Sequence, residues 1–218
     1  MADTTRLPEL QRRALDRLSA VPLLEGFYLA GGTAIAMHLG HRTSLDLDLF
    51  SLSPDTDLEP AKAAVRGAFE KAETVQQTDA AVHLLCDGTP IDLVRYPYPL
   101  LRPPLREGSW LAIAGLLDLA TMKLSAIARR GLKRDFWDLE TIVTRGGVPL
   151  WEASQAYLLR FGVAEADLYH VFRALTYFEE ADKDPDLPAG LTPRAWQDLK
   201  SFFRREVPVL MSRVLRGG

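Results

Sequence analysis

A proline-rich stretch, "YPYPLLRPP" at residues 96–104, limits how this chain can fold. Proline lacks an amide hydrogen and its ring clashes with the preceding helical turn, so the stretch cannot be a regular helix. Before it, strand and helix patterns alternate, whereas after it the apolar residues follow helical spacing. We therefore expect an α+β fold with two parts: a mixed α/β half, residues 1–104, and a helical half, residues 105–218.

Turn and cap signals divide each half into elements. In the first half we expect helices at 7–18, 33–39 and about 55–72, and strands at 26–30, 44–50, 81–86 and 91–96. In the second half we expect helices at 113–130, 132–145, 150–161, 164–181 and 194–205.

Composition excludes several classes of protein. The formal net charge is −3 over 218 residues, so there is no global attraction to nucleic acid or to an anionic membrane. A local excess of Lys and Arg does lie between Arg95 and Arg134, and it is either a solvated face or a phosphate-attracting surface. The single cysteine, Cys86, excludes an internal disulfide. Since neither a signal peptide nor a membrane span is evident, we expect a cytoplasmic protein with no membrane partner.

Two aspartates mark the strand "SLDLDLF". On an extended strand Asp46 and Asp48 point the same way, about 7 Å apart. Carboxylates at that spacing suit Mg²⁺, which prefers oxygen ligands and is often shared with substrate phosphates. The alternative is that the two acids form only the wet face of an amphipathic strand.

The residues before this strand predict a phosphate site. Gly31 and Gly32 end a short strand, and a helix is expected to start at Thr33, where free amides and the helix dipole favour an anion. Asp92, in "PIDLVRY", is the candidate third metal ligand and a candidate base for an attacking hydroxyl. An aspartate at a strand edge can equally be structural.

Two charged residues fall on core-facing stripes of the helical half. Lys123 lies in the middle of an apolar stripe, with Arg130 seven residues later on the same side. Lys123 either snorkels to water or points its charge at a phosphate. Asp135 lies on the next apolar stripe and must be paired. Its partner is Lys123 or Arg130 in a structural ion pair, or Asp135 has a direct catalytic or substrate-orienting role.

Three segments together resemble the AbiEii/AbiGii-type nucleotidyltransferase toxins of abortive-infection and type IV toxin–antitoxin systems. "GGT" followed by "GHRTSLDLDLF" is similar to the first motif of the nucleotidyltransferase superfamily, and "KLSAIARRGLKRDFWDL" to the lysine and aspartate motifs of this branch. "ALTYFEEADKDPDLP" is similar to a segment near the C-terminus of many members. The resemblance implies a nucleotidyltransferase-like fold, a small mixed sheet with flanking helices that carries the active site, followed by a helical half.

The resemblance also implies roles for individual residues. Asp46 and Asp48 would be metal ligands, and Lys123 would contact the nucleotide phosphates. Asp135 would be the acid of a later motif. The phosphate-loop and signature positions are Gly32, Thr33, Arg42 and Ser44.

These features predict a Mg²⁺-dependent nucleotidyltransferase, with Mn²⁺ as the alternative ion. It would move a nucleoside monophosphate from a nucleoside triphosphate to a hydroxyl of RNA, such as a tRNA end, or of a protein. The resemblance implies that the enzyme acts as a toxin with an antitoxin partner. A metal-dependent phosphodiesterase or nuclease, and a non-catalytic nucleotide-binding module, remain as alternatives.

Overall fold

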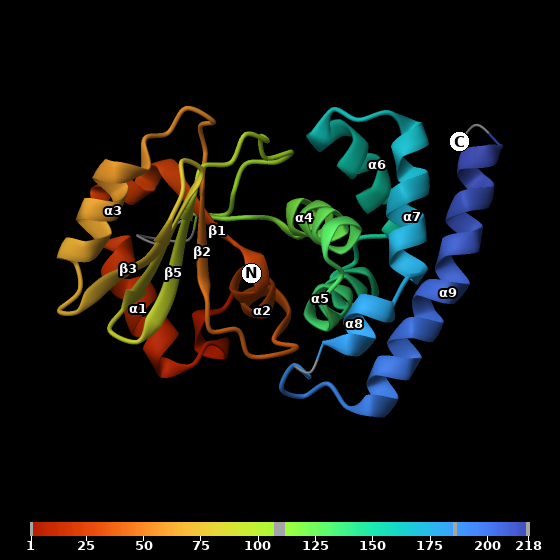
Figure 1. Cartoon of the computed structure of the whole chain (residues 1–218), viewed down its shortest axis with the longest axis horizontal. Helices are drawn as coiled ribbons and strands as arrows, with labels where there is room; N and C mark the ends of the chain where they lie inside the picture. The colour runs from red at the N-terminus through yellow and green to blue at the C-terminus, as the bar shows by residue number, and fades with distance from the viewer. Residues whose placement is uncertain (1, 107–111, 185–186, 217–218) are drawn as a thin grey trace. The chain divides into compact units, whose positions relative to one another are not determined.

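The computed structural model describes residues 2–106, 112–184 and 187–216. The chain divides into two compact units, Met1–Gly115 and Leu116–Gly218. Figure 1 shows a sheet with its helices in the first unit and helices alone in the second. The mixed sheet with flanking helices that the sequence predicts is confirmed.

The strands described in the first unit form one mixed sheet in the order β3-β4-β5-β2-β1-β6. Strand β2 pairs antiparallel with β1 and parallel with β5, which places it in the middle of the sheet. The edge strands are β3 and β6, and β6 runs parallel to β1. The strands are β1 (Phe27–Ala30), β2 (Leu47–Ser51), β3 (Ala72–Gln77), β4 (Ala81–Cys86), β5 (Thr89–Val94) and β6 (Ala112–Ile113).

Alternating side chains give the middle of this sheet two different faces. On β2 the side chains of Leu47 and Leu49 are fully buried, whereas Asp48 between them is partly exposed. Strand β5 repeats this pattern with buried Ile91 and Leu93 around a partly exposed Asp92. One face therefore belongs to the core, and the other presents polar side chains.

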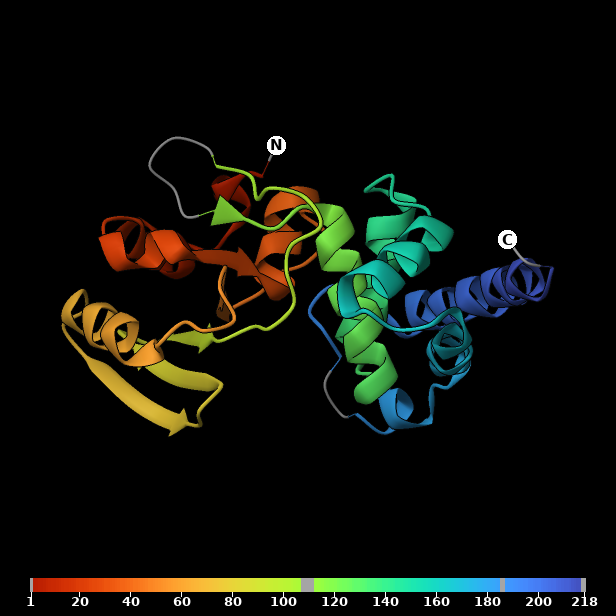
Figure 2. The ribbon, with the colours of Figure 1, turned by 90° about the horizontal axis from the view of Figure 1, so that it is seen from above.

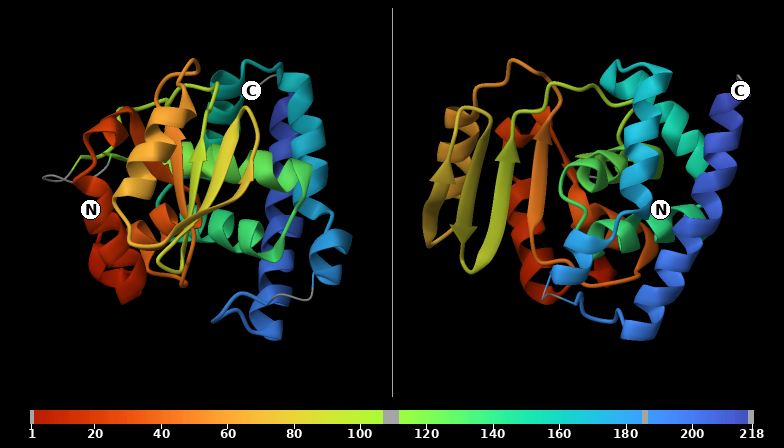
Figure 3. Two further views of the ribbon diagram at one scale, coloured as in Figure 1. Left: turned by 60° about the vertical axis from the view of Figure 1, so that its left-hand side comes forward. Right: turned by 45° about the vertical axis from the view of Figure 1, so that its right-hand side comes forward.

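Three α-helices are described in the first unit: α1 (Glu9–Ser19), α2 (Gly31–Leu39) and α3 (Leu58–Gly67). Helix α3 packs against β3, β4 and β5, and α2 packs against β1 and β2. In the left view of Figure 3, α3 lies beside the strands of this sheet. Helix α2 ends at Leu39, and Gly40 directly after it has a left-handed φ of 57°, as expected of a glycine that follows a helix.

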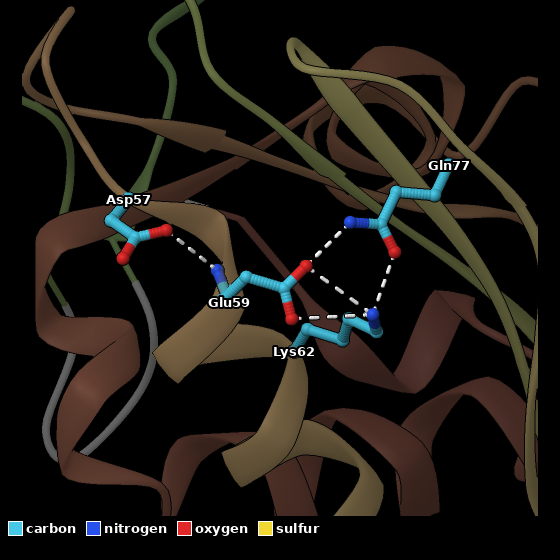
Figure 4. A network of polar contacts seen from close by, with 4 residues as sticks. All are labelled: Asp57, Glu59, Lys62 and Gln77. Carbon is cyan, nitrogen blue, oxygen red and sulfur yellow. Dashed lines mark hydrogen bonds and ion pairs between the residues drawn. The ribbon is translucent and has the colours of Figure 1, made fainter.

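Strand β3 was not expected from the sequence, because most of its side chains are exposed and give no apolar alternation. The strand pairs with β4 through the backbone and is also tied to α3. Lys62 donates hydrogen bonds to Glu59 and to Gln77, and Gln77 donates to Glu59, while Asp57 caps the helix (Figure 4). Polar contacts at the sheet edge therefore hold this strand to its helix.

Other boundaries in the first unit also differ from the expectations. Helix α2 begins at Gly31 rather than Thr33, so the glycine pair forms its first turn. Strand β2 begins at Leu47, three residues later than expected, and Leu45 is 56% exposed. Helix α3 ends at Gly67 and not near residue 72, and the short edge strand β6 was not expected. Pairing with neighbouring strands sets the limits of β2 and β6, and a single sequence does not identify those partners.

The second unit is helical in the part that the structure describes. Its helices are α4 (Leu116–Arg129), α5 (Lys133–Thr144), α6 (Leu150–Phe161), α7 (Leu168–Thr176), α8 (Glu179–Lys183) and α9 (Pro193–Leu215). Helix α4 packs against α5, α6 and α7, and α7 packs against α9. The right view of Figure 3 shows α7 and α9 side by side.

Two expectations for this unit were wrong. The single helix expected at 164–181 is a 3₁₀ turn (Glu165–Asp167) followed by the separate helices α7 and α8. The last helix is much longer than expected, since α9 continues past Pro208 to Leu215. Figure 2 shows this last helix in blue, leading to the C-terminus. Packing of its apolar face outweighs the hydrogen bond that proline removes. Among the described residues, no helix has the length and apolar character needed to cross a membrane.

Candidate functional site

Gly31 brings the start of α2 against the carboxylate of Asp48. Its φ is +65°, a conformation that other residues adopt only with strain. A Cβ atom at this position would lie 1.8 Å from Oδ2 of Asp48. The register of β1 and β2 explains the approach, because Asp48 pairs with Ala30, the residue before Gly31. Glycine is therefore required here both for the turn and for the room that Asp48 occupies.

Gly32 makes room for the loop between α2 and β2. A Cβ atom there would lie 2.3 Å from Nη2 of Arg42 and 2.8 Å from Oγ of Ser44. Thr33 is fully buried, and its hydroxyl donates a 2.5 Å hydrogen bond to the carbonyl oxygen of Asp46. Both contacts hold the segment that leads to Asp48. Because the hydroxyl of Thr33 donates this hydrogen bond to Asp46, the main-chain amide is the group of Thr33 that can bind a phosphate.

A row of polar residues crosses the exposed face of the sheet. Asp48 of β2 pairs in register with Asp92 of β5, and Asp92 pairs with His83 of β4. Neighbouring strands are about 5 Å apart, so paired side chains on one face lie next to each other. Nδ1 of His83 is 2.8 Å from Oδ1 of Asp92. The structure thus places Asp92 between His83 and Asp48.

The carboxylate oxygens near this row are the kind of ligand that a hard divalent cation prefers. Asp48 and Asp92 supply carboxylates from adjacent strands, and Asp46 lies one residue before β2 with an exposed side chain. Mg²⁺ prefers such oxygen ligands and takes the rest of its shell from water and substrate phosphates. Within residues 2–106, 112–184 and 187–216, no three acidic, His or Cys side chains converge in a group able to hold a metal. The protein therefore offers part of a coordination shell.

In the second unit, Lys123 of α4 lies between two carboxylates of α5. Its Nζ is 2.8 Å from Oδ1 of Asp135 and 2.8 Å from Oδ2 of Asp138, and both aspartate side chains are fully buried. Burial alone would lower the pKa of Lys123, but Asp138 and Asp135 outweigh it and raise that pKa. Of the three N–H donors of this ammonium, two are directed at carboxylates. The ion pair that the sequence offered as one alternative is present.

Arg130 extends this cluster to the surface. Its Nε is 3.4 Å from Oδ2 of Asp135, and its side chain is 56% exposed. Burial would raise the pKa of Asp135, but Lys123 and then Arg130 lower it below its usual value. Arg129 and Arg134 are exposed near the same turn between α4 and α5. The turn therefore presents three exposed arginines, and Arg130 contacts the buried carboxylate of Asp135.

Sequence reasoning missed two members of these clusters. Sequence periodicity does not single out Asp138, which lies as close to Lys123 as Asp135 does. His83 is not singled out either, because the four histidines of the chain have no ligand spacing. The alternation of β4 indicated its face, but only the register between β4 and β5 pairs His83 with Asp92.

Comparisons with known proteins agree with this fold. A family model described as "Nucleotidyl transferase AbiEii toxin, Type IV TA system" matches residues 13–97. An uncharacterized protein of Aquifex aeolicus is 33% identical over 207 residues, which are 93% of this chain and 96% of that protein.

Two solved structures are similar in fold. The nucleotidyltransferase toxin MenT4 from Mycobacterium tuberculosis has a TM-score of 0.58 at 15% identity, over 93% of this chain and 91% of that one. A putative nucleotidyltransferase from H. pylori has a TM-score of 0.51 at 16% identity, over 94% of both chains. At these identities the likeness concerns the fold alone.

Proposed function

This chain belongs to the AbiEii nucleotidyltransferase toxin family, and we propose that it moves a nucleoside monophosphate from a nucleoside triphosphate to a hydroxyl of RNA. One observation carries the proposal: Asp48 and Asp92 pair in register on one sheet face, and Asp48 reaches the first turn of α2. Carboxylates and helix amides together offer sites for a divalent cation and for phosphates.

We propose that different residues bind the metal ion and the phosphates of the triphosphate. Asp46, Asp48 and Asp92 are the proposed ligands of Mg²⁺ or Mn²⁺ together with the phosphates of the substrate, because the three carboxylates do not converge on one ion by themselves. When bound, such an ion offsets the charge of the triphosphate and of the transition state. The amides of Gly31, Gly32 and Thr33 open α2 and have no partner within the helix, so they are the proposed phosphate donors. Arg42 and Ser44 hold the following loop against Gly32.

The transfer itself needs little from individual side chains beyond position and charge. An acceptor hydroxyl oxygen bonds to the α-phosphorus, the bond to the bridging oxygen breaks, and pyrophosphate leaves. The hydroxyl proton passes to a carboxylate, for which we propose Asp92. Asp92 lies beside Asp48 on the exposed face, where solvent and an acceptor can reach it.

For the second unit we propose that Lys123 and Arg130 bind phosphate oxygens. Lys123 keeps one N–H beyond its two carboxylate contacts, and its side chain is 10% exposed. Asp135 accepts a hydrogen bond from Lys123, which supports a role in holding the lysine in place. We also propose for Asp135 the catalytic role that the resemblance implies. The exposed guanidinium groups of Arg129, Arg130 and Arg134 favour an RNA acceptor, because they can neutralise backbone phosphates.

We also propose that the protein works in the cytoplasm and that it is the toxin of a toxin–antitoxin pair, the role that the family description names. Unregulated transfer to an essential RNA would be harmful, and an antitoxin would restrain it. Loss of toxicity in the Asp48→Ala variant on induced expression would support the link between the chemistry and this role.

The deciding experiment follows label from each of the four α-³²P nucleoside triphosphates into total RNA and total protein, with Mg²⁺. The wild type is compared with Asp48→Ala and with Asp79→Ala, which removes an exposed acid outside the site. We expect label in RNA for the wild type and for Asp79→Ala, and none for Asp48→Ala.

The other outcomes separate the alternatives. Label in protein would overturn the RNA acceptor and keep the reaction. Shortened RNA without label would indicate a nuclease or phosphodiesterase. Nucleotide binding without any change in RNA or protein would indicate a binding module. Full activity in a folded Asp48→Ala variant would refute the proposed site.

A further inference from the structure

His83 contacts a carboxylate of the candidate site, yet neither the motifs nor the proposed function uses it. It lies on β4, pairs with Asp92 across the β4–β5 ladder, and places Nδ1 2.8 Å from Oδ1. The two side chains are 39% and 26% exposed, so this contact is not part of the core. A surface pair of this kind adds little to stability.

The chemistry of the pair gives the bond a direction. A carboxylate only accepts hydrogen bonds, so Nδ1 of His83 must carry the hydrogen that it shares with Asp92. That bond engages Oδ1 on the side of β4. Asp48 flanks Asp92 on the other side, on β2. With Oδ1 held, Oδ2 is the oxygen of Asp92 that His83 leaves for a ligand.

We propose that His83 is the positioning residue of Asp92, and that it fixes the carboxylate so that Oδ2 serves the site shared with Asp48. The inference rests on the proposed function, because it assumes that Asp92 works with Asp48. An aspartate side chain without such a bond rotates about χ2, which is a broad torsion. Residues that orient a metal-binding side chain typically change metal affinity or activity by about 10- to 100-fold when removed.

Two substitutions separate positioning from polarity. In His83→Asn the amide nitrogen can occupy the place of Nδ1 and donate to Asp92. In His83→Gln it falls near the place of Nε2, one bond further along the side chain. Both variants keep a polar amide at a partly exposed site, so they differ mainly in whether Asp92 is held. His83→Leu removes the donor altogether, and His170→Leu controls for loss of an exposed histidine on α7.

The first readout is the binding of Mn²⁺ alone, measured as the loss of the free-ion signal in electron paramagnetic resonance. We expect His83→Leu and His83→Gln to raise the Kd roughly 10-fold or more, and His83→Asn to stay within about 3-fold of wild type. His170→Leu should bind as the wild type does. The rate of label transfer should follow the same order, and the melting temperatures should be similar for all variants.

The outcomes distinguish this inference from the function on which it rests. If Mn²⁺ binding depends on Asp48 and Asp92 but is equal in wild type, His83→Gln and His83→Leu, the role of His83 is refuted alone. If the wild type binds no Mn²⁺, or binds it equally after Asp48→Ala, the metal site and the role of His83 both fail. If His83→Asn is as impaired as His83→Leu, the bond from Nδ1 is not the cause.

Discussion

Replacing Gly31 by alanine tests the geometry that joins α2 to Asp48. Two separate penalties apply. The first is backbone strain at a φ of +65°, roughly 1–2 kcal/mol for a residue with a Cβ atom. The second is steric, because the new Cβ would lie 1.8 Å from Oδ2 and 2.7 Å from Cγ of Asp48. Forcing extra atoms into an occupied site costs about 1–3 kcal/mol, so we expect a total loss of about 2–5 kcal/mol.

Gly88 provides a control in the same unit. Its φ is +84°, and a Cβ atom there would meet its nearest neighbour, Cδ2 of Leu10, only at 4.0 Å. Gly88→Ala therefore carries the backbone strain without the clash, and it should lower the free energy of unfolding by about 1–2 kcal/mol. The difference between the losses in free energy of unfolding of Gly31→Ala and Gly88→Ala measures the clash with Asp48.

The assay is urea unfolding followed by circular dichroism, repeated in an Asp48→Ala background. Removing the carboxylate takes away the two closest atoms and leaves Cβ of residue 48 at 3.1 Å. The loss caused by Gly31→Ala should then fall towards that of Gly88→Ala. If Gly31→Ala costs the same with and without the Asp48 carboxylate, the close approach described here is wrong. The single variant should also lose label transfer, because Asp48 must move.

Three further predictions concern buried groups. Asp135→Ala should lower the free energy of unfolding by about 3 kcal/mol, which is at the low end for a broken buried pair because Asp138 still holds Lys123. Asp198→Ala removes an exposed acid of α9 and should change the free energy of unfolding little. An equal effect of the two variants would contradict the ion pair. The lowered pKa of Asp135 contributes stability above its unfolded pKa of about 3.9, and this is lost as the pH falls through the folded pKa. The stability difference between wild type and Asp135→Asn should therefore be constant from about pH 5 to 8 and shrink below about pH 4, whereas a constant difference at acid pH would argue against a lowered pKa. Burial raises the pKa of the Cys86 thiol to about 11, so iodoacetamide at pH 8 should modify it only after unfolding in urea, and rapid labelling of the native protein would show that the thiol is accessible.

Local patterns in the sequence predicted much of the fold. Alternation identified the strand that contains Asp48, and helical spacing identified α4 and α5 with Lys123 and Asp135 on their buried faces. These patterns are informative because the apolar residues of a helix or strand repeat with the period of that element on the side that faces the core. The same reasoning failed for β3, whose side chains are largely exposed, and for the break between α7 and α8.

Sequence periodicity indicated which face of a helix or strand carries residues such as Asp48, Asp92 and Lys123. Which charged side chains meet depends on how the elements pack against one another. Strands β2 and β5 are separated by a helix and two strands along the chain, yet their parallel register pairs Asp48 with Asp92, and the next ladder adds His83. The packing of α4 on α5 likewise selects both Asp135 and Asp138 for Lys123. Register and helix packing arise from contacts distant in the chain, and the periodicity of a single element carries no information about them.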